Sequence, residues 1–179
     1  MGYYGNCPQD KGAFVMARYD KAQALAYLDE HKIPYEKMEH APVYTMEEMD
    51  AAGISAKGGV VKNLFLRDAK GKHHFLVVVP EEKRVDLGSL SDQIGASKLS
   101  FASAERLEKY LGVVQGAVSP LGVLNDENHA VEVVFDRDLT HAAKLGIHPN
   151  DNTATVWLSF RDLKKLIENL GNAISFIKV

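Results

Sequence analysis

Residues 58–80, GGVVKNLFLRDAKGKHHFLVVVP, are the stretch that most constrains how this chain can fold. Two apolar runs rich in β-branched residues flank the polar segment 68–72, a pattern typical of a β-hairpin. Side chains alternate along a strand, so one face of the first strand carries Val60, Lys62, Leu64 and Leu66, and the other Val61, Asn63, Phe65 and Arg67. Both faces are mostly apolar, which indicates a central strand covered on both sides.

Lys62 lies in the middle of that strand, among residues that favour burial. Burying an ammonium without a partner is strongly unfavourable. Three outcomes are open: the side chain reaches water, pairs with an internal carboxylate, or lines a pocket that receives an anion. Local contradictions of this kind tend to mark functional sites, so Lys62 is the first candidate residue.

The composition of the chain is that of an ordinary globular protein. With 179 residues, 46% of them hydrophobic and 25% charged, we expect one domain over residues 20–179. Residues 1–19 show no periodicity and are predicted to be a leader or an N-terminal arm. No apolar run approaches the roughly 18 residues that span a bilayer, so no membrane partner is expected. The single cysteine, Cys7, indicates a reducing cytoplasm.

The net charge of −3 argues against a protein that coats duplex nucleic acid, and no DNA partner is expected. A smaller contact with nucleic acid remains open, because the predicted hairpin carries a group of basic residues. These are Lys62, Arg67, Lys70, Lys72, His73 and His74. The alternative is a solvated turn whose lysines serve solubility.

Capping residues and apolar periodicity divide the rest of the chain. Helices are predicted to begin after Asp20, Thr45, Asp86, Ser103 and Ser159, with a short helix at 138–145. Strands are expected at 35–40, 130–135 and 153–158, with an edge strand in the tail 173–179. Residues 112–128 are loop-rich, and 146–152 form a turn. The fold class is therefore mixed α/β, a central mixed and largely antiparallel sheet flanked by helices.

Common catalytic motifs are missing from the sequence. It has no phosphate-binding Walker loop, no Gly-x-Gly-x-x-Gly after a strand and no Gly-x-Ser-x-Gly elbow. The seven histidines show no metal-ligand spacing, so neither a metal nor a cofactor is expected. Polar groups at unusual places remain: the 116–120 loop, His148 before Pro149, and Asn152 with Thr153. Each of these, taken alone, is more typical of an ordinary turn than of a functional site.

Four ordered segments together resemble a known family. They are KNLFLRD at 62–68, KLSFAS at 98–103, GAVSPLGVLND at 116–126 and HPNDNTAT at 148–155. The chain resembles the YbaK/prolyl-tRNA-synthetase-associated editing superfamily over roughly residues 20–172. Within it, the chain is most similar to the free-standing prolyl-tRNA editing proteins that deacylate alanyl-tRNA(Pro).

The resemblance implies an aminoacyl-tRNA hydrolase with a cleft for the aminoacylated 3′ end of tRNA(Pro), and possible transient contact with prolyl-tRNA synthetase. Lys62 matches the lysine required for deacylation, and Asn63 follows it. Residues Gly116, Ala117, Val118, Ser119 and Pro120 match a loop whose main chain holds the ester and a water. His148 bounds the aminoacyl pocket, Asn152 and Thr153 belong to the same segment, and Thr45 lies near the terminal nucleotide.

The substrate has alternatives at this point. Val60 and Val61 stand where the alanyl-specific pattern carries His-Thr. A deacylase for cysteinyl- or seryl-tRNA, or a non-catalytic regulator that binds an amino acid or tRNA, is therefore also considered. An aminoacyl ester is already activated, so a positioned water and charge stabilisation suffice for hydrolysis, without a Ser-His or Cys-His pair.

Overall fold

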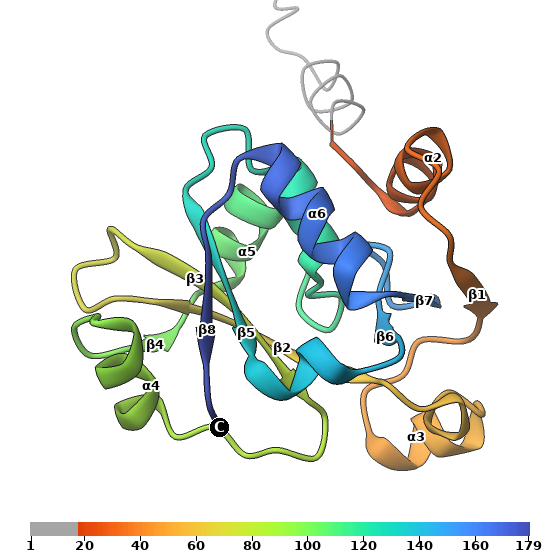
Figure 1. Ribbon diagram of the computed structural model, residues 1–179, viewed down its shortest axis with the longest axis horizontal. Helices are drawn as coiled ribbons and strands as arrows, with labels where there is room; N and C mark the ends of the chain where they lie inside the picture. The colour runs from red at the N-terminus through yellow and green to blue at the C-terminus, as the bar shows by residue number, and fades with distance from the viewer. Residues whose placement is uncertain (1–17) are drawn as a thin grey trace, which may run out of the picture.

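The computed structural model describes residues 18–179, which form two β-sheets with helices packed around them (Figure 1). The predicted leader, residues 1–19, lies outside the described residues except for its last two. None of the helices within 18–179 is long and apolar enough to cross a membrane.

The larger sheet has five strands in the order β4-β2-β3-β5-β8. Their bounds are β4 Ser100–Phe101, β2 Val61–Arg67, β3 His74–Pro80, β5 Val131–Asp136 and β8 Ile174–Ile177. Strand β2 runs antiparallel to β3 and β4, whereas β5 runs parallel to β3 and β8. The predicted hairpin is confirmed, with Lys62 paired to Val79 and Arg67 to His74. The tail also adds the expected edge strand.

The smaller sheet is antiparallel, in the order β1-β7-β6, with bounds Glu36–Glu39, Ala154–Leu158 and Leu145–Ile147. Its strand β6 replaces the end of the helix expected at 138–145 and the start of the turn expected at 146–152. Only a 3-10 helix, η3 (Arg137–His141), forms there. Strand β6 passes close to β7 because Gly146 has no side chain: a Cβ there would lie 2.7 Å from Trp157 Nε1.

The two sheets meet at a short junction. Val60, just before β2, forms a parallel bridge with Gly146 of β6, and the Gly146 amide donates to the Gly59 carbonyl at 2.8 Å. The indole N–H of the buried Trp157 donates to the Gly58 carbonyl, also at 2.8 Å. The start of β2 is thereby fixed against the smaller sheet.

The helices begin where their capping residues predict. They are α2 Lys21–Glu30, α3 Met46–Ala51, α4 Leu87–Ile94, α5 Ala104–Leu111 and α6 Phe160–Leu170, with 3-10 helices η1 Ser55–Lys57 and η2 Pro120–Asn125. Asp20 and Thr45 each form a capping box, as their spacing to a residue three positions later predicts. Gly112 and Gly171 end α5 and α6 in the left-handed conformation.

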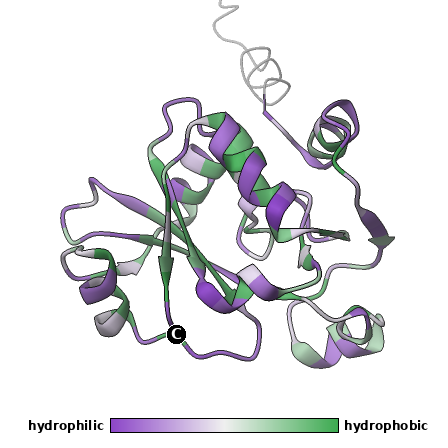
Figure 2. Ribbon diagram, viewed as in Figure 1, coloured by the Kyte–Doolittle hydropathy of each residue, from purple (hydrophilic) through white to green (hydrophobic). Residues whose placement is uncertain are grey.

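The five-stranded sheet is covered on both faces, as the two apolar faces of β2 predict. Helix α4 packs on one face, where its Leu90 joins Leu66, Val77 and Val79 in one apolar cluster. The other face carries the larger apolar cluster, to which α5, α6 and η2 contribute (Figures 1 and 2). Asn63 shares this second face with Val61 and Phe65, and the candidate site lies there.

Candidate active site

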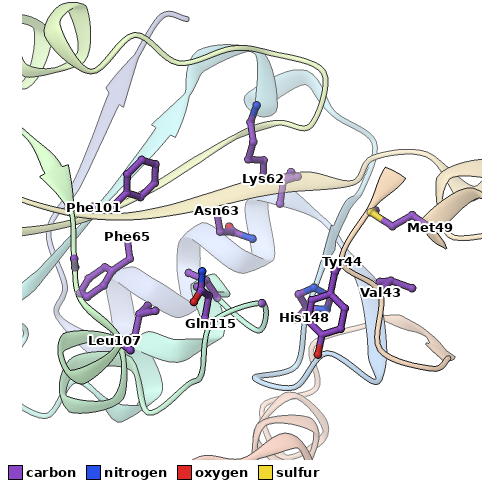
Figure 3. A pocket seen from close by; sticks show the side chains of 15 residues that line it. Val43, Tyr44, Met49, Lys62, Asn63, Phe65, Phe101, Leu107, Gln115 and His148 are labelled. Carbon is purple, nitrogen blue, oxygen red and sulfur yellow. The ribbon is translucent and has the colours of Figure 1, made fainter. Parts of the chain in front are cut away.

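A cleft of about 520 Å³ opens beside β2 (Figure 3). It is bounded by β2, the segment leading into α3, the start of α5, the 115–118 loop and the end of β6. Its lining includes Val43, Tyr44, Met49, Val61, Lys62, Asn63, Phe65, Phe101, Ala102, Ala104, Leu107, Gln115, Gly116, Val118 and His148. A neighbouring hollow of about 250 Å³ shares Lys62, Asn63 and His148 with it. Five segments that are separate in the sequence are thus brought to one place.

Asn63 is the polar side chain that β2 directs toward the 115–118 loop (Figure 3). Its amide oxygen is buried and accepts no hydrogen bond from any residue in 18–179. A buried amide without a partner is unfavourable in a folded protein and calls for an explanation. A bound substrate group at this point of the cleft would supply the missing partner.

Lys62 also lines the cleft, but its side chain points the other way along β2. Figure 3 shows it directed away from Asn63 and Gln115. Its ammonium donates to the main-chain carbonyl of Lys83, and it forms no ion pair with any residue from 18 to 179. None of the three outcomes considered for Lys62 includes this main-chain bond. The carboxylate pair, one of those three, is not formed.

The segment that receives Lys62 is itself fixed by Lys83. The Lys83 ammonium donates to Asp136 and Asp138, each at 2.6 Å, and to the Val179 carbonyl at 3.0 Å. These two carboxylates raise the pKa of Lys83, so it stays charged. Because the Asp136 side chain is fully buried, the pair anchors the end of β3 to the end of β5.

The 116–120 loop presents main chain to the cleft. Gly116 (φ +91°) and Val118 line it, whereas Ala117, Ser119 and Pro120 are buried beneath. The Ser119 hydroxyl accepts from the Leu121 amide and caps η2, which fixes the loop from below. The main-chain N–H groups of Gly116 and Val118 have no hydrogen-bond partner among residues 18–179. Two free donors therefore lie at the cleft wall.

His148 follows β6 and closes the cleft opposite the loop (Figure 3). Burial lowers its pKa, which outweighs the opposing effect of its hydrogen bond to the Ala154 carbonyl. The neutral ring donates from Nδ1 to that carbonyl at 3.1 Å, which leaves Nε2 as an acceptor. The ring of His40 lies 6.4 Å away, between centroids.

The remaining predicted residues support the site from outside. The Asn152 amide bonds main-chain groups of Val43, and Thr45 caps α3 by accepting from the Glu48 amide at 3.2 Å. Thr153 faces away from the cleft, because its hydroxyl bonds Lys21 at 2.9 Å and the Asp151 carboxylate. Neither threonine lines the cleft.

Three lining residues had no signal of their own in the sequence. Tyr44 is 72% exposed and Phe101 is 62% exposed, and together with Gln115 they form part of the cleft's rim. Exposed aromatic residues cannot be told from buried ones by composition, and only the fold places them together. No group of three or more His, Cys, Asp or Glu side chains suited to a metal occurs within 18–179.

Comparisons with known proteins agree with this geometry. Residues 40–166 match the family model described as aminoacyl-tRNA editing domain. The chain is 53% identical over 159 residues to the prolyl-tRNA editing protein ProX of Acetoanaerobium sticklandii, which covers 89% of this chain and 97% of that protein. It is 36% identical to prolyl-tRNA synthetase associated domain-containing protein 1 of Danio rerio, over 89% of this chain and 88% of that one.

A solved structure described as a proposed trans-editing enzyme for prolyl-tRNA synthetase has the same fold. It superposes with a TM-score of 0.64 at 22% identity and covers 89% of this chain and 97% of that one. The mixed α/β fold expected from the sequence is thereby confirmed. The chain belongs to the aminoacyl-tRNA editing domain family, which confirms both the resemblance and the expected aminoacyl-tRNA hydrolase.

Proposed function

We propose that this protein is a trans-editing hydrolase that removes alanine from mischarged tRNA(Pro). The single observation that carries the proposal is the cleft itself, which is lined by Asn63, by Gly116 and Val118 with their free N–H groups, and by His148. The 53% identity to a prolyl-tRNA editing protein supports tRNA(Pro) as the carrier. The preference for alanine is the finer part of the proposal.

Hydrolysis of an aminoacyl ester makes few demands on the residues of the cleft. The ester between an amino acid and a ribose is already activated, so hydrolysis needs a held carbonyl and a placed water. The N–H groups of Gly116 and Val118, which line the cleft without a hydrogen-bond partner among residues 18–179, supply the donors that stabilise an ester oxygen or a developing oxyanion in this proposal. Asn63 holds the ribose or the ester through its amide. His148, neutral at pH 7, limits the depth of the pocket and accepts a hydrogen bond at Nε2.

Lys62 acts from the rim in this proposal. Its ammonium is bound to a neutral carbonyl, and no carboxylate in 18–179 pairs with it, so the charge is available to an anion. A terminal phosphate forms a stronger, charge-assisted bond than the Lys83 carbonyl does. Rotation of the side chain toward the substrate would exchange one partner for the other. Lys62 thus binds the RNA end and stabilises developing charge, while the loop holds the water.

Alanine fits the walls around Asn63. Val43, Met49, Val61 and Val118 offer apolar surface to a methyl group and no hydrogen-bond partner to a hydroxyl. Attraction for a methyl supplies only about 1–3 kcal/mol, so rejection of the proline ring must come from size. Exclusion by fixed walls is consistent with the anchoring of the Val43 main chain by Asn152 and of the 116–120 loop by the Ser119 cap.

The test is deacylation of tRNA(Pro) carrying alanine, cysteine, serine or proline, each at the same concentration. We expect release of alanine to be fastest and prolyl-tRNA(Pro) to be spared. Lys62→Ala should lower kcat/KM by at least a hundredfold, whereas Lys165→Ala, on the exposed face of α6, should leave it unchanged. Faster release of cysteine or serine would displace alanine as the substrate, and turnover of none would favour a binding protein of this fold.

The partner synthetase is tested in the same assay. We propose that the enzyme acts on free tRNA and meets prolyl-tRNA synthetase only transiently. Adding the synthetase without ATP should change kcat/KM by less than twofold. A larger acceleration would mean that the two proteins work as a complex.

A further inference from the structure

The two ends of the cleft carry opposite charge. Figure 3 shows Phe65, Phe101 and Leu107 at one end and Val43, Tyr44 and Met49 at the other. The second end adjoins α3, whose exposed face bears Glu47, Glu48 and Asp50. Glu81 lines the neighbouring hollow, and burial together with the carboxylates of Asp50 and Glu82 raises its pKa. Lys62, on the strand between the two ends, acts in the opposite direction and lowers the pKa of Glu81.

The end at Phe101 adjoins the tip of the β2–β3 hairpin. Arg67 of β2 pairs with Ser100 of β4, and the Ala69 amide donates to the Ser97 hydroxyl at 3.2 Å. The tip and the approach to β4 therefore form one surface. Its basic members are Arg67, Lys70, Lys72, Lys98 and Arg106, which we call the hairpin patch. The sequence already places three of these five on the hairpin.

The hairpin patch is ordered rather than loose. Arg106 of α5 donates to the Gly71 carbonyl at 3.0 Å and to His74 Nε2 at 2.8 Å, which ties the hairpin tip to the helix. Asp68 accepts from the amides of Lys72 and His73 within the turn and is buried. Because these bonds use main chain or Arg106, the turn does not need the side chains of Lys70 and Lys72 to keep its shape.

The lysines of the hairpin patch are free to bind an anion. Lys70, Lys72 and Lys98 are exposed and make no ion pair with any residue of the described part of the chain. The hairpin and α5, which carry four of the five cations, also carry the carboxylates of Glu105 and Glu108 and the buried Asp68. These carboxylates are fewer than the cations. In a chain whose net charge is −3, this concentration of cations at one end of the cleft is a directional feature.

We propose that the acceptor strand of the tRNA leaves the cleft past Phe101 and lies with its phosphates on the hairpin patch. This inference rests on the proposed function for the position of the ester, at Asn63 and Gly116. The four steps along β2 from Asn63 to Arg67 span about 13 Å, so the patch begins close to the end of the RNA. Phe101, 62% exposed, lies between the two and offers its ring to a base released from stacking.

The opposite route is disfavoured by electrostatics. A strand leaving past Tyr44 would bring its phosphates over Glu47, Asp50 and Glu81, and like charges repel. The charge at the two ends thus selects one of two directions for the RNA. Such a division lets a protein with an acidic overall balance bind RNA at one place without attracting it elsewhere.

The test measures binding of uncharged tRNA(Pro) by fluorescence anisotropy over a series of KCl concentrations. The double variant Lys70→Glu, Lys72→Glu reverses the charge of two lysines proposed to bind phosphates. It should raise Kd at least tenfold at low salt. The slope of log Kd against log salt should fall by about 2. The matched control is the double variant Lys32→Glu, Lys165→Glu. It changes the net charge of the protein by the same amount, but at positions just after α2 and on α6. Its Kd should stay within twofold.

Two further measurements decide the direction. Neutralising the acidic end with Glu47→Gln and Asp50→Asn should leave Kd within twofold of the wild type, because the RNA lies away from α3. Hydrolysis of alanine from a 3′-alanyl adenosine, which lacks the acceptor strand, should be unchanged in the Lys70→Glu, Lys72→Glu double variant. With full-length alanyl-tRNA the same double variant should show a raised KM at unchanged kcat.

The proposal is overturned if the double variant binds tRNA as the wild type does, or no worse than the Lys32, Lys165 control. It is also overturned if neutralising α3 tightens binding more than twofold, because the repulsion that is removed would mean that the RNA leaves past Tyr44. The outcome is separable from the proposed function. A wild type that hydrolyses no aminoacyl-tRNA would refute the activity, while the binding titrations would still decide the surface.

Discussion

The side-chain amide of Asn152 bonds both main-chain groups of Val43. Its Nδ2 donates to the Val43 carbonyl at 2.8 Å, and its Oδ1 accepts from the Val43 amide at 3.4 Å. Asn152 lies just before β7, so this contact holds the wall of the cleft that carries Tyr44 to the smaller sheet. The width of the cleft at this end therefore depends on one buried amide.

Asn152→Ala should loosen that wall. Leaving the Val43 groups without partners is expected to lower the free energy of unfolding by about 1–3 kcal/mol, read from urea denaturation. KM for alanyl-tRNA should rise more than kcat falls, because binding geometry is lost before chemistry. Asn169→Ala, an exposed asparagine on α6, is the control and should change stability by less than about 0.5 kcal/mol.

Gly116→Ala tests the close approach of the loop to Tyr44. Gly116 has φ +91°, and a Cβ there would lie 3.0 Å from Tyr44 Cε1. The left-handed conformation alone costs a residue with a Cβ about 1–2 kcal/mol. We expect a displaced loop and a fall in kcat/KM of at least tenfold. Adding Tyr44→Ala to this variant removes the crowding and not the backbone strain, so recovery should be partial; full recovery would mean that φ is unimportant here.

Asn63→Leu separates activity from stability. The Asn63 amide oxygen has no partner among residues 18–179, so an apolar side chain of similar size should leave the free energy of unfolding equal or higher. If Asn63 holds the substrate, kcat/KM should nevertheless fall by at least tenfold. Ser175→Ala is a matched control, because the Ser175 hydroxyl is also buried without a partner but lies on β8, away from the cleft. A large loss of stability in Asn63→Leu would contradict the assignment.

The stability of the fold should fall as the medium is acidified below about pH 6.5, the ordinary pKa of histidine. Burial lowers the pKa of His148 and of His74, and Arg106 lowers that of His74 further. In this range the unfolded chain binds more protons than the folded one, so stability rises with pH and is lost as pH falls toward the lowered values. Urea midpoints between pH 7.5 and 5.5 measure the decline.

Substitution identifies which histidine is responsible. His148→Gln and His74→Gln should each flatten the pH dependence, whatever their effect on stability at pH 7.5. His73→Gln, which removes an exposed imidazole beside His74, should leave the slope of the wild type. If neither buried histidine alters the slope, the decline has another origin.

Much of the framework follows from local rules. The hairpin follows from two alternating apolar runs around a polar turn, and the starts of α2, α3, α4, α5 and α6 follow from their capping residues. Strand β6 does not, because its three residues are shorter than any periodic pattern and Gly146 reads as a turn. What makes it a strand is its antiparallel pairing with β7, a contact between distant segments in which Gly146 lies against the Trp157 indole.

In the candidate site, too, some residues could be predicted from the sequence and others depend on tertiary structure. Asn63, Gly116 and His148 were found through motifs and do meet at one cleft. Tyr44 and Phe101 were not found, because their exposure is decided by tertiary structure. The hydrogen-bond partner of Lys62 could not be predicted from the sequence either. Alternation along β2 places Lys62 and Asn63 on opposite faces of the strand. The Lys83 carbonyl that accepts from Lys62, however, is held in place by the ion pairs of Lys83 with Asp136 and Asp138.

The chain contains one tryptophan, Trp157, and its indole spans the junction between the two sheets by bonding the Gly58 carbonyl. Its intrinsic fluorescence is consequently a built-in optical reporter for this junction, free of added labels. A ligand that shifts the start of β2 should change the emission, whereas one that moves only the hairpin tip should leave it unaltered.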